Sequence, residues 1–278
     1  MNLPEALKIS VVMSVYNGAD TLKRSVESIL QQTYADFELI IVNDGSTDET
    51  SAQLNIFADH DSRIRLLSSP SRQGLTRSLM RAIHEACGTY IARQDADDWS
   101  DPRRLRTQLS FMEQSSKSAL IGSWFRISDE KGAHHLKTYP DEDQTLRRLL
   151  LTQNPFCHAS VMFPKHFYEK AGGYNPDFET GQDLDLWLRL AQLGELRMVE
   201  SYLVEKCVSA SSRRKAWKQV RDGFRIRWKH RFFWPGKRNR IRIFGTAFYQ
   251  ILITCLPLGW IVFLRTARSL KGTAGLMK

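Results

Sequence analysis

The stretch ISVVMSVYNGADTLKRSVESILQQTYADFELIIVNDGSTDET, residues 9–50, decides the class of fold. Residues 9–15 and 37–42 are apolar runs of strand length, and each is followed at once by polar residues and glycine. Between them, apolar residues recur every three to four positions from residue 22 to residue 30, as on one face of a helix. Two strands joined through a helix by short links predict a parallel βαβ unit.

The same alternation continues beyond this unit. Short apolar strands are expected at residues 64–67 and 89–92, with helical stripes at 75–86 and 105–112. The first of these helices is expected to end at Gly88, because glycine readily adopts the left-handed conformation that closes helices. The pattern predicts an α/β protein with a mostly parallel sheet that binds ligands at the carboxyl ends of its strands.

Carboxylates gather directly after the fourth expected strand, in the sequence RQDADDWSDP. Asp95, Asp97 and Asp98 lie so close that their mutual repulsion is costly unless a cation accompanies them. Mg²⁺ and Mn²⁺ bind carboxylate oxygens and leave coordination positions for phosphate. A solvated acidic turn is the alternative interpretation, and Asp101 before Pro102 is better explained as the start of a helix.

Polar residues also follow the first two strands, as SVYN and NDGSTD. The second of these, residues 43–48, is equally well explained by a turn that caps the next helix. All three polar clusters are expected at the same edge of one sheet, which predicts a binding site there.

Composition favours a folded cytosolic protein with a separate basic tail. The hydrophobic content of 42% and charged content of 25% are typical of globular domains. The four cysteines form no CxxC pair and are expected to be reduced core thiols, and the N-terminus lacks the apolar core of a signal peptide. The net charge of +10 is uneven, because 18 Lys and Arg residues but one acidic residue follow Glu205. The tail is therefore net +17 and the body net −7.

Residues 209–278 are predicted to form a basic, aromatic and apolar helical region that associates with the membrane, after a domain of residues 1–208. Aromatic residues alternate with cations between Trp217 and Trp234, and residues 243–264 carry no charge. That length can span a bilayer, but basic flanks on both sides favour a re-entrant or interfacial anchor. The alternative that this region is a buried helical subdomain, packed on the first domain, stays open. Nucleic-acid binding is not expected, because it does not need the uncharged run.

Three segments together resemble the bacterial type of family 2 glycosyltransferase, which has the GT-A fold. They are the stretch quoted first, RQDADDWSDPRRL, and CHASVMFPKHFYEKAGGYNPDFETGQDLDLWLRL, in the family's order over about residues 8–195. The resemblance implies that residues 1–208 form a GT-A domain with a Rossmann-like sheet that binds a nucleotide-diphosphate sugar, with uridine diphosphate as the expected nucleotide. Thymidine and guanosine diphosphates are the alternatives.

The resemblance also implies roles for residues on the nucleotide side. Tyr16 would stack on the base and Ser14 would line the same pocket. Asp44 would contact the nucleoside, and Arg72 would lie near the nucleoside or the phosphates.

On the reaction side, the resemblance matches the three clustered aspartates to the family's DXD element. Asp95 and Asp97 would bind the nucleotide sugar, and Asp97 and Asp98 would hold Mn²⁺ or Mg²⁺. Many members also have a histidine near residues 204–212, but this chain has none there, so a third protein ligand for the metal is not identified.

Asp183 matches the family's catalytic base. It lies in the first turn of a helix expected at residues 182–193, where the helix dipole favours an ionised carboxylate. Gln182 stands where the family usually has glutamate. The alternative is that Asp183 and Asp185 have only a structural role, as acidic residues in the first turn of a helix. His158 is assigned either to the acceptor side or to a buried structural role.

These inferences predict an inverting, metal-dependent glycosyltransferase on the cytoplasmic side of the inner membrane. Its acceptor is expected to be a lipid-linked or cell-envelope saccharide of lipopolysaccharide, O-antigen or capsule type. Two alternatives stay open: a metal-dependent nucleotidyltransferase, and a membrane scaffold with a degenerate nucleotide-binding domain.

Overall fold

The computed structural model divides the chain into two compact units, Met1–Ser209 and Ala210–Lys278. Each unit is described by itself. The structure describes residues 7–129, 134–178, 180–208, 213–233, 241 and 244–246.

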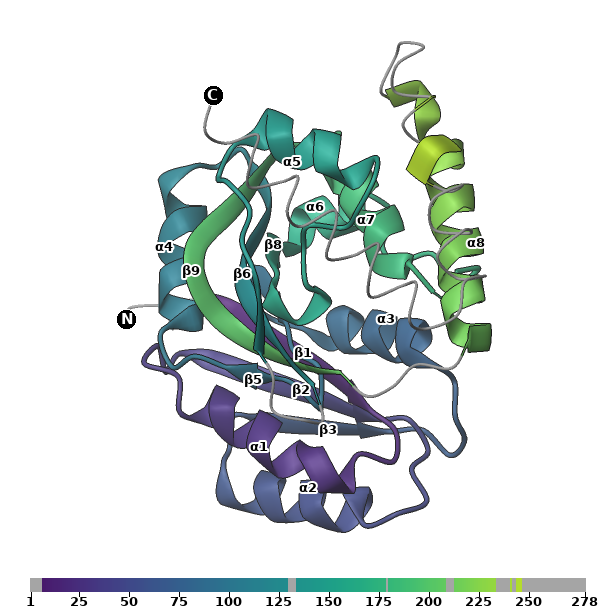
Figure 1. The fold of residues 1–278 in the computed structure, drawn as a ribbon. Helices are drawn as coiled ribbons and strands as arrows, with labels where there is room; N and C mark the ends of the chain where they lie inside the picture. Colours follow the sequence, from purple (N-terminus) through teal and green to yellow (C-terminus); the bar gives the residue numbers. More distant parts are fainter. Residues whose placement is uncertain are drawn as a thin grey trace. The chain divides into compact units, whose positions relative to one another are not determined.

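The described part of the first unit is built on one nine-stranded sheet (Figure 1). Its spatial order is β3-β2-β1-β4-β8-β6-β9-β5, with β7 paired to β6. In chain order the elements are β1 (Ile9–Val15), α1 (Ala19–Leu30), β2 (Phe37–Asn43), α2 (Thr50–His60), β3 (Ile64–Ser68), α3 (Leu75–Glu85), β4 (Tyr90–Arg93), β5 (Trp99–Ser100), α4 (Arg104–Gln114), β6 (Ser118–Asp129), β7 (His134–Lys137), α5 (Asp143–Leu150), the 3-10 turn His158–Ser160, β8 (Met162–Pro164), α6 (Lys165–Lys170), α7 (Gln182–Leu190) and β9 (Glu195–Val208).

The first four strands along the chain form the parallel half of the sheet. β1 lies between β2 and β4, with Ile9 opposite both Phe37 and Tyr90. β2 is buried along its whole length, as a continuous apolar run covered on both faces requires. The predicted strands are thus confirmed, with ends that differ from the expected ones by about one residue.

Beyond β4 the sheet is mixed. β4 pairs antiparallel with β8, and β6 pairs antiparallel with β8 but parallel with β9. The short strand β5 pairs antiparallel with β9, which places Trp99 opposite Glu205. The segment just after the acidic cluster therefore lies beside the end of β9, although about a hundred residues separate them in the chain.

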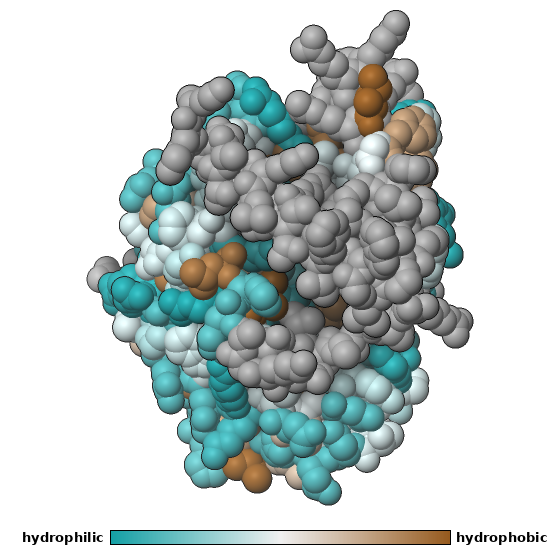
Figure 2. All heavy atoms as spheres, in the orientation of Figure 1, coloured by the Kyte–Doolittle hydropathy of each residue, from teal (hydrophilic) through white to brown (hydrophobic). Residues whose placement is uncertain are grey.

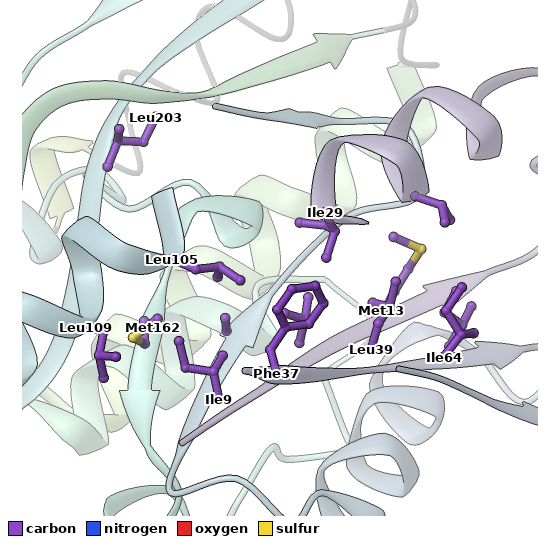
Figure 3. Close-up of a cluster of buried hydrophobic side chains, with 14 of the residues drawn as sticks. Ile9, Met13, Ile29, Phe37, Leu39, Ile64, Leu105, Leu109, Met162 and Leu203 are labelled. Atoms are coloured by element: carbon purple, nitrogen blue, oxygen red, sulfur yellow. The ribbon is translucent and has the colours of Figure 1, made fainter. Parts of the chain in front are cut away.

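The main core lies between the sheet and the helices α1, α2 and α4. Alternate residues of β1 point into it, beginning with Ile9, and they meet apolar residues such as Ile29 of α1 and Leu105 of α4 (Figure 3). The helix α3 covers the opposite face of the sheet (Figure 1). This packing on both faces holds the carboxyl ends of the strands in fixed positions.

Two local predictions are wrong. The third helix ends at Glu85, before Gly88. Gly88 instead permits close packing, because a Cβ there would lie 2.5 Å from the backbone nitrogen of Ser10. The cysteines of the described residues are free, but Cys87 is exposed in the loop before β4, so it is not a core thiol.

The second unit contains the helix α8 (Arg213–Lys229) and a 3-10 turn at Arg231–Phe233. Phe224 stacks on Trp228, and Phe244 packs against both rings. Among the residues that the structure describes, no helix combines the length and the apolar character needed to cross a bilayer. Residues 243–264, apart from 244–246, lie outside the described residues, which are coloured by hydropathy in Figure 2.

Candidate active site at the carboxyl edge of the sheet

Asp44 anchors the loop before α3 at this edge of the sheet. It follows β2, is only 2% exposed, and its own backbone N–H donates to the carbonyl of Val15 at the end of β1. The backbone N–H groups of Gln73 and Gly74 donate to its two carboxylate oxygens, both at 2.8 Å. A buried carboxylate with two such bonds holds the loop before α3 against the strand ends.

The anchored loop places Arg72 on Tyr16. The guanidinium carbon lies 4.1 Å from the centre of the Tyr16 ring, a cation–π distance, and the ring is 38% exposed. Gly45 allows the loop to approach so closely, because a Cβ there would lie 2.7 Å from the backbone carbon of Ser71. Ser14 is half-buried near the end of β1. The structure thus brings Tyr16 and Arg72 into contact. Asp44 holds the loop that carries Arg72.

The acidic cluster follows β4, as the sequence predicts. Asp95, Asp97 and Asp98 each offer a carboxylate oxygen within 4.8 Å of the others. Arg93, whose side chain is fully buried, donates to the carboxylate of Asp95. Burial opposes ionisation of Asp95, but Arg93 and the other nearby cations lower its pKa to about 2.

Asp98 has the surroundings of a cation ligand. Its Oδ1 accepts the backbone N–H of Cys207 at 3.0 Å, and its Oδ2 is buried without a hydrogen-bond partner among the described residues. Burial and the charge of Asp95 hold the pKa of Asp98 well above its ordinary value. An unpaired buried oxygen beside two further carboxylates fits Mg²⁺ or Mn²⁺, which require oxygen ligands and positive charge.

Asp183 lies in the first turn of α7. Gly181, directly before the helix, has a left-handed backbone with φ of 75°. The side-chain amide of Asn154 donates to Asp183 Oδ2 at 2.8 Å, which orients the carboxylate. Burial raises the pKa of Asp183 above its ordinary value, a shift that makes the carboxylate a better proton acceptor.

His158 is buried in an aromatic cluster beside α7. Its Nε2 lies 2.8 Å from the hydroxyl of Tyr174, and its ring meets those of Tyr174 and Trp187 edge-on. Burial, together with the charge of Arg93, lowers the pKa of His158 to about 3, so the imidazole is neutral at physiological pH. Gln182 is also buried, and its Oε1 has no hydrogen-bond partner among the described residues.

Lys206 is the site residue that the sequence analysis missed. Electrostatic interactions with Cys157 and with the carboxylates of Asp95, Asp98 and Asp183 raise the pKa of its ammonium group, although burial opposes the shift. These interactions also link the acidic cluster to Asp183 through one cation. A lysine within residues 204–212, the segment that lacks the expected histidine, was the signal available in the sequence.

The family model for "Glycosyl transferase family 2" matches residues 10–170, more than half of the chain. The chain belongs to this family. The predicted family 2 membership is therefore confirmed, and the protein is a glycosyltransferase.

Two bacterial relatives match this glycosyltransferase over most of the family region. EpsE of Bacillus subtilis, whose name gives glycosyltransferase as a provisional activity, is 37% identical over 67% of this chain and 68% of its own length. The O-antigen biosynthesis glycosyltransferase WbnJ of Escherichia coli is 36% identical over 66% of this chain and 71% of its own length.

Solved structures identify the fold of this glycosyltransferase. S. aureus TarS residues 1–349, in complex with UDP, superimpose with a TM-score of 0.63 over 79% of this chain and 65% of that one, at 15% identity. The complex of TarS 1–349 with UDP-GlcNAc gives a TM-score of 0.64 over 90% of this chain and 82% of that one, at 12% identity. The predicted GT-A fold is confirmed.

Proposed function

We propose that this enzyme transfers a sugar, with inversion, from a uridine-diphosphate sugar to a hydroxyl group of a lipid-linked or cell-envelope saccharide. The acceptor would be of lipopolysaccharide, O-antigen or capsule type. The observation that carries the proposal is that Asp183 and the acidic cluster are electrostatically linked, since Asp95 acts on Asp183 and both act on Lys206. A cation-binding group beside a positioned carboxylate base is what displacement of a nucleoside diphosphate requires.

The exposed ring of Tyr16 supports binding of the nucleotide base, because an aromatic face offers stacking. Asp44 fixes the loop that presents Arg72 beside this ring, so the nucleoside would meet a preformed surface. TarS was crystallised with UDP and with UDP-GlcNAc, which makes uridine the first choice for the base.

Asp97 and Asp98 would hold Mn²⁺ or Mg²⁺, with Asp95 beside them. When bound, the ion would compensate the negative charge that develops on the departing diphosphate. Arg93 keeps Asp95 ionised next to that position, since it lowers the pKa of this carboxyl to about 2.

Asp183 would take the proton of the acceptor hydroxyl as that oxygen attacks the anomeric carbon. One displacement without a covalent intermediate inverts the anomeric centre. Asn154 holds the carboxylate by the hydrogen bond to Oδ2. His158 and Gln182 would lie on the acceptor side, where both are buried and would support the surface that meets the sugar.

A nucleotide-sugar panel tests the proposal. We expect one uridine-diphosphate sugar, with Mn²⁺, to raise the melting temperature of the purified protein. Incubation of that donor with lipid-linked saccharides should release UDP, and NMR should detect a product of inverted anomeric configuration. Release of a sugar 1-phosphate from the donor would instead indicate nucleotidyl transfer. A retained configuration would contradict the single displacement.

We also propose that the enzyme acts at the cytoplasmic face of the inner membrane, held there by residues 209–278. The net charge of +17 after Glu205 favours an anionic leaflet, and the aromatic cluster around Trp228 suits the headgroup region. The full-length protein should float with vesicles of anionic phospholipid and stay bound in about 1 M NaCl, because salt screens charge but not apolar burial. Complete release by salt would contradict an apolar anchor.

A further inference from the structure

The side chains at the end of β9 alternate between two different environments. Glu205 and Cys207 both contact Arg24: Nη2 of Arg24 lies 2.7 Å from Glu205 Oε1, and Nη1 lies 3.2 Å from Cys207 Sγ. Val204 packs in the opposite direction, in the small core around Cys157. The register with β6 is regular here, with Lys206 opposite Ile127.

Strand geometry therefore turns Lys206 away from Arg24 and toward the small core around Cys157. Residues two apart in a strand share a face, so Lys206 points the same way as Val204. Ile127, opposite Lys206, also packs against the small core around Cys157. The backbone N–H of Cys207, the next residue, donates to Asp98 Oδ1 at 3.0 Å, which fixes this end of the strand against the cluster.

The charges around Lys206 are strongly unbalanced. Asp95, Asp98 and Asp183 all interact with its ammonium group. Burial raises the pKa of Cys157 to about 12, so this thiol is neutral at physiological pH and adds no negative charge beside Lys206. A diphosphate that enters this site adds further negative charge, which requires cations that can reach it.

Arg93 and Lys206 both lower the pKa of Asp95, and Lys206 is the one of this pair that can meet a ligand. Arg93 is completely buried and donates to Asp95. Lys206 is half-buried at the end of its strand, so part of its side chain is exposed. An ammonium group has three donors and no acceptor, so it binds phosphate oxygens but cannot ligate a metal. The unpaired Oδ2 of Asp98 independently indicates that the site is completed by a ligand.

We propose that Lys206 is a built-in cation that binds the diphosphate of the donor and gives the enzyme metal-independent affinity for it. The inference rests on the proposed function, since it assumes a nucleoside-diphosphate donor. Without the donor, the neighbouring carboxylates hold the ammonium. With the donor bound, the ammonium moves to the phosphate oxygens. A divalent cation then adds to an affinity that already exists.

Calorimetric titration of the full-length protein with UDP, in excess EDTA and separately in Mn²⁺, tests the proposal. We expect UDP to bind the wild-type protein in EDTA. Lys206→Met should weaken that binding roughly tenfold or more, since hydrogen bonds to charged groups are the strong ones. Lys206→Arg should keep most of the affinity. Arg24→Met is the matched control, because it removes one positive charge from the opposite face of β9 and should leave binding unchanged.

Uridine, which lacks phosphate, separates a direct contact from a structural role. Lys206→Met should bind uridine as tightly as the wild-type protein does. Equal weakening for uridine and UDP would overturn the proposal, as would wild-type binding of UDP only in Mn²⁺. If UDP binds only in Mn²⁺, the role of Lys206 is wrong but the proposed transfer reaction is still possible. If UDP does not bind under any condition, the uridine donor itself is wrong. If Lys206→Met does not fold, Lys206→Gln provides the same comparison.

Discussion

Asp44 and Asp98 occupy similar positions in the sheet but have different surroundings. Both follow a strand of the parallel half, and they are 2% and 1% exposed. Asp44 accepts two backbone N–H groups, one on each oxygen. Asp98 accepts one, leaves its second oxygen unpaired among the described residues, and lies in a cluster with two more carboxylates.

The difference indicates that the Asp44 carboxylate is structural, whereas the Asp98 carboxylate is available to bind a ligand. Burying a carboxylate is costly unless hydrogen bonds compensate it. Around Asp44 the loop itself supplies that compensation, so the nucleotide side is organised before any ligand arrives. Around Asp98 the compensation is incomplete, so a bound cation can supply it. We therefore expect substitutions on the reaction side to reduce turnover, and substitutions on the nucleotide side to reduce stability or binding.

Asp183→Asn should have the largest effect on turnover. Loss of a general base lowers rates by typically about 10²–10⁴-fold. Asparagine can still accept the hydrogen bond from Asn154, so the local structure should survive. Steady-state kinetics should therefore show a collapse of kcat, while titration with UDP shows unchanged affinity.

The pH profile sharpens this prediction. The pKa of Asp183 is raised by burial, and the ionised form is the base, so turnover should fall as pH decreases through that raised pKa. The acid limb should lie above the ordinary range of an aspartate and vanish in the residual activity of Asp183→Asn. Asp177→Asn, an exposed change nearby, should leave the rate and the profile unaltered. An Asp183→Asn enzyme with full activity would exclude the assignment.

Asp98→Ala and Asp97→Ala test whether a bound cation compensates the buried carboxylates of the acidic cluster. Turnover should require a divalent cation and should fall by about 10²-fold or more in either variant, because the departing diphosphate loses charge compensation. In wild-type protein with UDP, Mn²⁺ should raise the melting temperature, and this increment should disappear in Asp98→Ala. Asp101→Ala is the control from the same stretch, since its carboxylate binds Arg103. Full turnover in excess chelator would rule out the metal requirement.

Much of the fold followed from local patterns. β1 and β2 are continuous apolar runs bounded by polar turns, and such runs are recognisable without knowledge of the rest of the chain. The acidic cluster was equally visible, because three carboxylates occupy four consecutive positions at a strand end. These features depend on residues that are close in sequence.

Features that depend on distant pairing were missed. Lys206 joins the site only because β9 pairs with β6 and β5, and nothing within residues 204–208 specifies those partners. Arg93 lies completely buried in the core, where a charged residue is rare unless paired. The misplaced end of α3 has the same origin, since Gly88 is required by contact with β1 and not by the helix.

Asp44→Ala should have its main effect on stability. The N–H groups of Gln73 and Gly74 would lose their acceptor, and a buried polar group left unpaired costs about 1–3 kcal/mol. We expect the free energy of unfolding in urea to fall by about 2–4 kcal/mol, with Asp44→Asn intermediate because one oxygen remains. Asp59→Ala, an exposed change on α2, is the control. Unaltered stability in Asp44→Ala would remove the distinction between the two carboxylates.

The smallest effect on the enzyme is expected from substitution of Tyr16. This change alters the nucleotide side but leaves intact the hydrogen bonds by which Asp44 holds the loop before α3. If the ring stacks on the base, Tyr16→Ala should weaken UDP binding by about tenfold, since aromatic stacking on a base is worth about 1–3 kcal/mol. Tyr16→Phe should bind almost as the wild-type protein does, because only the ring face is used. Turnover at saturating donor should change little in either variant, in contrast to Asp183→Asn.

Tyr202 provides the matched control for this experiment, since Arg126 lies over its ring at 4.9 Å, as Arg72 does over Tyr16 at 4.1 Å. Tyr202→Ala removes the same kind of cation–π contact from β9, so it should leave UDP affinity unchanged. Equal losses in Tyr16→Ala and Tyr16→Phe would assign the binding to the hydroxyl. A loss of turnover at saturating donor in Tyr16→Ala would mean that the nucleotide side also sets the geometry of the reaction. The environments of Asp44 and Asp98 would then not separate binding from catalysis.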